Sequence, residues 1–215
     1  MNPIFTPHKP GRRRFASGLA LTGLALLAGC SLLPKPAPVE LYRLPSARAQ
    51  TEARAPQLAL SLRIARPAAG TLLAGQRILV LPDGERVSYY KGANWAEPAP
   101  LLLRNRLLDA LRADGRIATL SSDDRILQAD FELDGDLRAF QSVYVEGTPQ
   151  IELRLDLRLL RAATQRVVAS RSFELRQTAS GQTLPEVVRA FGLASDTVAL
   201  QVTDWVVEQL GSAPR

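Results

Sequence analysis

Apolar and polar residues alternate along most of the chain after residue 38, and this period of two predicts β-strands. The alternation is clearest over residues 129–139 and 151–159, where apolar residues or glycine alternate with residues that are mostly charged. Residues 167–177 return after a turn at 162–165. Three long strands with one apolar and one charged face predict an antiparallel sheet that is covered on one side only.

Shorter strands are predicted ahead of these three. Residues 39–45 and 58–64 alternate in the same way, and residues 77–81 are a compact apolar run. The Pro-Asp-Gly sequence that follows is typical of a tight turn, because proline and glycine supply its backbone angles. The chain therefore returns over residues 86–90 as the second strand of a hairpin. A further short strand is expected over 116–120, and loops over 46–57 and 67–75.

Two segments repeat apolar residues at helical spacing instead. Residues 99–113 carry leucines on one side, with prolines at the start and Gly115 just after the end, both typical of helix boundaries. Residues 186–210 carry a second apolar stripe, and Thr183 with Glu186 forms a capping-box signature. The predicted fold is therefore α+β: a single domain with a mostly antiparallel sheet and two helices packed on one face.

The N-terminal segment has a different pattern. Basic residues at position 9 and positions 12–14 are followed by an apolar run of 10 residues, 19–28, that only Thr22 and Gly23 interrupt. This layout, closed by small residues, is typical of a secretory signal peptide. A helix that crosses a bilayer needs about 20 apolar residues, so the run is predicted to be an export signal and not an anchor.

The sequence Leu27-Ala28-Gly29-Cys30 resembles the lipobox of bacterial lipoproteins. The resemblance implies cleavage before Cys30, a diacylated thiol and an acylated amino group. The alternatives are an ordinary signal peptide with an incidental cysteine, or an N-terminal anchor helix. The predicted organisation is a removed signal peptide (1–29), the acylated cysteine with a proline-rich tether (30–38), the folded domain (39–211) and a short tail (212–215).

Charge and composition weaken several functional classes. The signal segment holds four of the 27 basic residues and none of the 21 acidic ones, so the mature net charge is only +2 (23 against 21). That balance gives little support for nucleic-acid binding. The only histidine is His8, in the segment to be removed, and the only cysteine is Cys30. Histidine-based triads, cysteine nucleophiles and the usual zinc sites are therefore excluded in the mature chain. We expect no enzyme, no metal and no cofactor apart from the covalent lipid on Cys30.

The densest acidic group lies on one predicted strand, at Asp130, Glu132, Asp134 and Asp136. Such carboxylates could hold Ca²⁺ or act as an acid–base pair. Alternate strand positions are about 7 Å apart on an open face, however, whereas a calcium loop needs tight turns that make its oxygens converge. The spacing favours a solvated sheet face, and no catalytic residue is predicted.

The segment from Tyr89 to Trp95 concentrates three of the chain's 12 aromatic residues in seven positions at the end of a predicted hairpin. Tyrosine and tryptophan often anchor protein interfaces. Two interpretations stay open, which can coexist: the aromatic residues close the joint between sheet and first helix, or they contact a partner. The candidate partner-binding residues are Tyr89, Tyr90, Asn94, Trp95 and Glu97, and we expect Trp95→Ala to weaken partner binding more than folding.

The same segment carries a family resemblance. Val87-Ser88-Tyr89-Tyr90 with Trp95-Ala96-Glu97-Pro98, preceded by Tyr42-Arg43-Leu44-Pro45 and the lipobox, is similar to the signature of the ABC-type transport auxiliary lipoprotein family, which includes PqiC/YmbA-like outer-membrane lipoproteins. The resemblance covers the mature chain. It implies a lipid-anchored protein at the periplasmic face of the outer membrane, beside an ABC transporter whose MCE-type component carries lipids between membranes.

The resulting hypothesis is a non-catalytic accessory subunit that docks the MCE-type component of an intermembrane lipid transporter. Alternatives from other classes are a structural envelope lipoprotein that binds cell wall or activates a wall synthase, and a carboxylate-dependent hydrolase. The expected partners are the outer membrane and the MCE-domain protein, with no nucleic acid. Direct contact with phospholipid and assembly into a homo-oligomer stay open.

Overall fold

The structure, a computed structural model, describes residues 38–45, 58–125 and 127–212. The chain divides at Pro38, and the features reported below belong to the unit that begins at Val39. The predicted signal peptide, Cys30, nearly all of the tether, the expected loop 46–57 and the last three residues lie outside the described residues. The expectations for these segments stay predictions.

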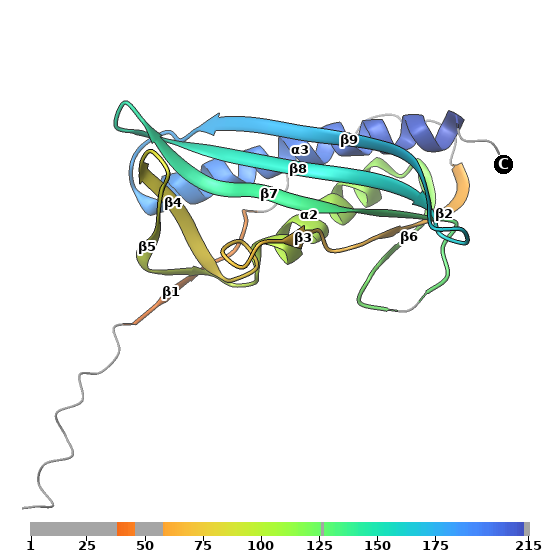
Figure 1. Ribbon diagram of the computed structural model, residues 1–215, viewed down its shortest axis with the longest axis horizontal. Coiled ribbons are helices and arrows are strands. Elements are labelled where there is room, and N and C mark those ends of the chain that lie inside the picture. Colours follow the sequence, from red (N-terminus) through yellow and green to blue (C-terminus); the bar gives the residue numbers. More distant parts are fainter. Residues whose placement is uncertain (1–37, 46–57, 126, 213–215) are drawn as a thin grey trace, which may run out of the picture. The chain divides into compact units, whose positions relative to one another are not determined.

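The predicted α+β fold is confirmed. The described residues form a nine-stranded sheet and two helices, α2 (Ala99–Asp114) and α3 (Leu184–Ser212). Figure 1 shows both helices behind the band of long strands, so the helices cover one face of the sheet. The strands are β1 (Glu40–Tyr42), β2 (Leu58–Ile64), β3 (Ala68–Ala69), β4 (Arg77–Asp83), β5 (Arg86–Trp95), β6 (Ile117–Ser122), β7 (Phe131–Val145), β8 (Thr148–Arg161) and β9 (Arg166–Thr178).

The three longest strands, β7, β8 and β9, pair antiparallel as predicted. β4 and β5 form the predicted antiparallel hairpin. The remaining pairings are short and parallel: β1 with β5, β2 with β6, and β2, β3 and β4 with β7. The sheet is thus mixed, and β7 is its centre, with β8 on one side and β2, β3 and β4 along the other.

A β-bulge in β7 changes which residues face the core. The register of β7 against β8 shifts between Leu137 and Ala139, so that Ala139 lies opposite the outward-facing Arg154 and Phe140 opposite the buried Leu153. Because an extra residue reverses the alternation, Ala139 projects to the side of the sheet opposite the main core, where it is nevertheless buried (1% exposed). Phe140 enters the core in its place.

The end of α2 and the start of α3 both have the boundary signals that the sequence predicts. Gly115 ends α2 in the left-handed conformation (φ 77°) and donates its backbone N–H to the carbonyl of Leu111. At the start of α3, the Thr183 backbone N–H and hydroxyl both donate to the Glu186 carboxylate, at 3.0 and 2.6 Å. Neither helix of the described residues is long and apolar enough to cross a membrane.

Candidate interaction surface

Among the described residues, no three His, Cys, Asp or Glu side chains gather where they could hold a metal ion. The sequence places its only histidine and only cysteine before residue 38.

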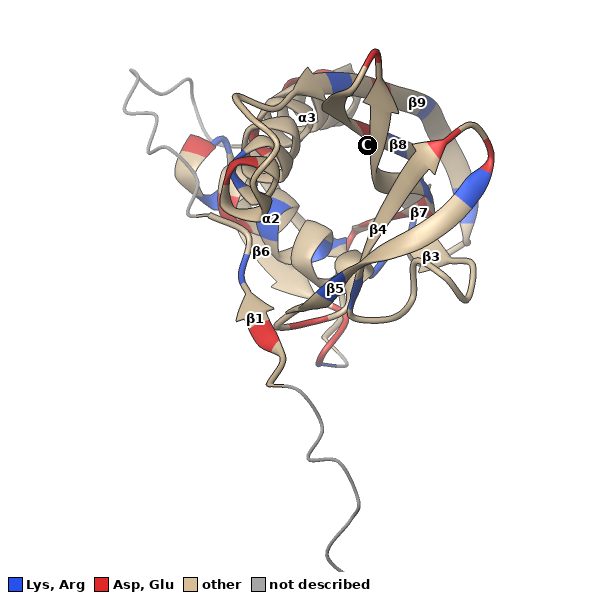
Figure 2. Cartoon of the chain, turned by 90° about the vertical axis from the view of Figure 1, so that its left-hand side faces the viewer, with Lys and Arg blue, Asp and Glu red and all other residues tan. Residues whose placement is uncertain are grey.

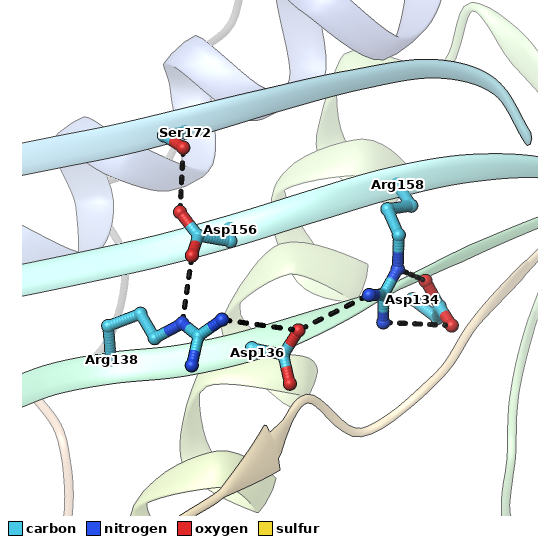
Figure 3. Close-up of polar contacts among 6 residues, drawn as sticks. All are labelled: Asp134, Asp136, Arg138, Asp156, Arg158 and Ser172. Atoms are coloured by element: carbon cyan, nitrogen blue, oxygen red, sulfur yellow. Dashed lines mark hydrogen bonds and ion pairs between the residues drawn. The ribbon is translucent and has the colours of Figure 1, made fainter.

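Within the acidic row at positions 130, 132, 134 and 136, the last two aspartates lie beside Arg158 of β8 and Arg138 of β7 on the open face of the sheet (Figure 3). Arg158 donates from Nε to Asp134 at 2.9 Å, and its terminal nitrogen lies 3.4 Å from Asp136. Asp136 and Asp156 face each other across the strands, where like charges repel. Arg138 offsets this repulsion, since its Nε donates to Asp156 at 2.8 Å.

Ser172 of β9 extends this network with a 2.6 Å hydrogen bond from its hydroxyl to Asp156. This bond, together with Arg138, lowers the pKa of Asp156 below its ordinary value. The hydrogen bond to Asp134 raises the pKa of Arg158 above its ordinary value. The network thus sets two arginines against three aspartates on β7 and β8, and β9 adds the neutral hydroxyl of Ser172.

The other two acidic residues of the row also have partners. The Asp130 carboxylate accepts the backbone N–H and the hydroxyl of Ser61, both at 2.7 Å, and these bonds lower its pKa. Glu132 accepts a hydrogen bond from Arg63. Each carboxylate of the row is thus engaged by a neighbouring strand, which makes the row a paired sheet face.

A shallow hollow of about 250 Å³ lies on the same outer side, over β8 and β9. Its lining alternates in charge, so it suits a polar contact and not an acyl chain. The lining residues are Glu152, Arg154, Glu174, Leu175 and Arg176.

Trp95 lies in the core. Its side chain is 0% exposed, and its ring packs on Phe140 at 5.7 Å and edge-on to Phe191 at 5.1 Å between centroids. The core-closure interpretation thus holds for this residue, since Trp95 joins β5 to β7 and α3. Because it has no exposed surface, Trp95 offers no direct contact to a partner, and Trp95→Ala should therefore affect folding more than binding, contrary to the expectation from the sequence.

The two tyrosines of β5 differ from each other. The Tyr90 hydroxyl lies 3.2 Å from the hydroxyl of the buried Ser142, and burial raises the pKa of Tyr90 to about 12. Tyr89 is half-buried, and the Arg77 guanidinium lies over its ring at 4.6 Å from the centroid. Tyr90 is therefore a sheet-packing residue, whereas Tyr89 with Arg77 presents an aromatic and cationic surface.

Asn94 and Glu97 complete the predicted segment. Asn94 faces Leu41 of β1 on one side and Arg77 of β4 on the other, and facing residues of neighbouring strands project to the same side. Glu97 is exposed in the turn before α2. We define the β5 surface as Arg77, Tyr89, Asn94 and Glu97. Figure 2 views the end of the domain where β1, β4 and β5 lie.

Two features of the structure could not be predicted from the sequence pattern. Arg104 and Arg106 of α2 are 3% and 6% exposed, although their charge favours the solvent side of a helix. Arg106 donates to Asp196 of α3 and to the backbone carbonyl of Pro45, just after β1. It thereby fixes the segment through which the chain enters the domain. Its acceptors lie 61 and 90 residues away, so no local signal marks them.

The second feature is a pair of exposed apolar side chains around β1. Leu41 is 68% exposed and Val39 is 52% exposed. Alternation alone predicted the strand but not that its outward residues would be apolar and uncovered. The only available signal was their position directly after the tether.

Comparison with known proteins adds a family match. The model of the family described as "ABC-type transport auxiliary lipoprotein component" matches residues 42–203. An uncharacterized protein of Bradyrhizobium diazoefficiens is 31% identical over 151 residues, which cover 70% of this chain and 40% of that protein. The chain thus spans about two fifths of the length of that relative.

Solved structures agree with the fold. A crystal structure of a protein from Xanthomonas campestris is 30% identical, with a TM-score of 0.72, and the alignment covers 79% of this chain and 95% of that one. A second crystal structure, of an uncharacterized protein, is 16% identical with a TM-score of 0.62, covering 79% and 99%. The second likeness bears on the fold alone.

Proposed function

Since the chain belongs to the family of ABC-type transport auxiliary lipoprotein components, we propose that it is an outer-membrane lipoprotein that docks the MCE-type component of an intermembrane lipid transporter. The family implies an accessory, non-catalytic role in transport and a membrane-associated lipoprotein that faces the periplasm. To this family role the proposal adds the outer membrane as the place of anchoring, the MCE-type component as the partner, and the β5 surface as the place where that partner docks.

The observation that carries the proposal is the extent of the family match. Residues 42–203 begin in β1 and end in α3, so the matched segment takes in nearly the whole described fold and not a single motif. A family relationship of this extent supports a shared role for the domain as a unit. The chain's resemblance to PqiC/YmbA-like lipoproteins supports the MCE-type component as the partner.

Anchoring is proposed to occur through Cys30. One acyl chain alone gives marginal membrane binding, since each buried CH₂ contributes about 0.8 kcal/mol, and two or more chains give stable anchoring. Ser31 follows the cysteine, where an aspartate would be expected to retain a lipoprotein at the inner membrane. This supports the outer membrane as the site of anchoring.

Docking is proposed to use the β5 surface. Tyr89 and Arg77 are residue types that often anchor interfaces, and here the guanidinium already lies over the ring. The strand that carries Tyr89 is fixed to the core at its end, because Trp95 is packed between β7 and α3. A preformed surface of this kind loses little conformational freedom when a partner binds.

Isolation of the acylated full-length protein from gently solubilised envelopes tests the proposal. We expect co-isolation of an MCE-domain protein with its permease and ATPase. Recovery of cell-wall fragments or a wall synthase, with no MCE-domain protein, would instead support a structural envelope lipoprotein and overturn the proposal. A Tyr89→Ser, Arg77→Ser variant is expected to lose the MCE-domain protein and still fractionate with the outer membrane. Val167→Ser, an exposed change on β9, is the matched control.

A further inference from the structure

The exposed apolar residues at β1 remain without a role in the docking described above. Leu41 has the most exposed of the large hydrophobic side chains among the described residues, and Val39 follows it. Exposed apolar side chains that lie together are a feature of surfaces that contact a partner or a membrane. We propose that Val39 and Leu41 contact the bilayer surface to which Cys30 is anchored and thereby orient the domain on it. This inference rests on the proposed acylation of Cys30.

The length of chain before β1 favours the bilayer as the occupant. Val39 lies nine residues after Cys30, and Pro34, Pro36 and Pro38 lie between them. Even a fully extended segment of this length spans only about 30 Å, at roughly 3.3 Å per residue. The acylated cysteine therefore holds Val39 and Leu41 close to the lipid at all times, so that a weak apolar contact forms at a high effective concentration.

Leu41 lies on a paired strand, and Val39 directly precedes that strand. β1 pairs in parallel with β5, and the Ala96 backbone N–H donates to the Tyr42 carbonyl at 2.7 Å. Arg106 holds the carbonyl of Pro45 a few residues later, and the Pro45 ring lies against Gly192, where a Cβ would be only 3.0 Å from it. Contact at Leu41 would consequently fix the orientation of the whole domain and not only of a loose terminal segment.

Charge on β1 also fits an anionic bilayer surface. The exposed Arg43 lies two residues after Leu41 and outside the β5 surface. Glu40, the acidic residue of β1, lies on the opposite side from Leu41, where its carboxylate accepts the Tyr42 hydroxyl at 2.6 Å. Apolar side chains with an arginine beside them suit the boundary between headgroups and acyl chains.

A fluorescent label at position 41 tests the contact. Full-length Leu41→Cys protein, acylated at Cys30, is labelled with the polarity-sensitive dye NBD and reconstituted into vesicles of phosphatidylethanolamine and phosphatidylglycerol. The matched control is Val167→Cys at the start of β9, which is also about half exposed (47%). Figure 1 shows β1 and the β8–β9 turn at opposite ends of the domain. We expect blue-shifted emission and quenching by spin-labelled lipids at position 41, and neither at position 167.

Several outcomes would overturn the inference. If the label at position 41 is as exposed to water as the label at 167, the bilayer is not the occupant, although the anchored protein and its docking role stand. Protection that appears only after addition of the MCE-domain protein, or only at raised protein concentration without vesicles, assigns the two residues to a partner or to a second copy. If the unmutated chain itself takes the label and does not float with vesicles, Cys30 is not acylated, and both the inference and the proposed anchoring fail.

Discussion

Replacing Trp95 with alanine is expected to destabilise the domain far more than it alters any exposed surface. The side chain is fully buried between Phe140 and Phe191, and those two rings are themselves 4.7 Å apart. Alanine at this position would therefore leave a cavity at the junction of β5, β7 and α3.

The magnitude follows from the area that Trp95 buries. An aromatic side chain buries roughly 150–250 Å², which at about 25 cal/mol per Å² corresponds to about 4–6 kcal/mol. A compact unfolded state lowers this figure by roughly 10–40%. Measured tryptophan-to-alanine changes in cores, about 3–5 kcal/mol, agree with the corrected value. We expect a loss of about 4 kcal/mol, a large part of a typical stability of about 5–15 kcal/mol.

Urea unfolding followed by circular dichroism measures this loss, and thermal unfolding should show a fall in Tm of about 8–16 °C for a domain of this size. Trp95→Phe keeps a ring in contact with Phe140 and Phe191 and should lose about half as much. Tyr89→Ala, on the same strand, removes mainly the contact with Arg77 and should cost about 1 kcal/mol or less.

The reasoning would be refuted if Trp95→Ala unfolded within about 1 kcal/mol of the unchanged protein while binding to the MCE-domain protein was lost. That pattern would mean that the residue contacts the partner directly, as the aromatic content of the segment first suggests. It would also mean that the packing around Phe140 and Phe191 does not depend on the tryptophan ring.

Three further changes test other parts of the structure. Arg106→Gln removes a buried guanidinium whose carboxylate partner is 20% exposed, and urea unfolding should show a fall of about 2 kcal/mol in the free energy of unfolding. The control is Arg112→Gln, in an ion pair whose side chains are 55% and 64% exposed, which should lower that free energy by under about 0.5 kcal/mol. Gly135→Ala places a Cβ 2.1 Å from a backbone carbonyl oxygen of β8 and should lower the free energy of unfolding by roughly 1–3 kcal/mol. Gly70→Ala, where a Cβ would meet no atom within 4 Å, should leave it nearly unchanged. Equal effects of the two substitutions would refute the close packing of β7 on β8. Because the pKa of Asp156 is lowered in the folded state, its contribution is present above the unfolded pKa of about 3.9 and is lost as pH falls through the folded value. Unfolding midpoints measured from pH 5 to pH 2 should therefore fall less steeply for Asp156→Asn, and an unchanged slope would contradict the assigned shift.

The strands and helices could be predicted because each is encoded by its own local pattern. The alternation over 151–159 and the leucines of α2 need no information from elsewhere in the chain. Pairing is different, since it joins residues that are far apart. The parallel contacts of β2 and β4 with β7 depend on crossovers through α2 and the loops, and no short stretch of sequence contains that information.

The bulge in β7 shows a second limit. The alternation of Leu133, Gly135 and Leu137 continues without a break to Ala139, yet the strand gains a residue at this point and reverses its faces. Arg138 reaches Asp156 as a result. Because the bulge depends on how β7 matches β8, the sequence of β7 alone predicts the wrong face for Ala139 and misses the entry of Phe140 into the core.

The candidate surface stays a prediction. Sequence composition singled out the segment that contains Tyr89 and Asn94, but it could not separate the buried Trp95 from the half-buried and exposed residues around it. Similarly, three arginines of α2 look equivalent in sequence, although Arg104 and Arg106 are buried by carboxylates that lie 19 and 90 residues away. Burial of aromatic and charged side chains is decided by such distant contacts.

Docking of a transporter component through the β5 surface is best tested by a binding titration. The acylated protein, held in vesicles, is titrated with the purified MCE-domain protein of the same cell, and the Kd is compared for the unchanged chain, Tyr89→Ser and the control Val167→Ser. We predict binding that weakens by about tenfold or more for Tyr89→Ser, as expected for an anchor residue worth at least about 1.4 kcal/mol, and that is unchanged for the control. No binding by the unchanged chain, or equal binding by all three, would contradict the proposed docking.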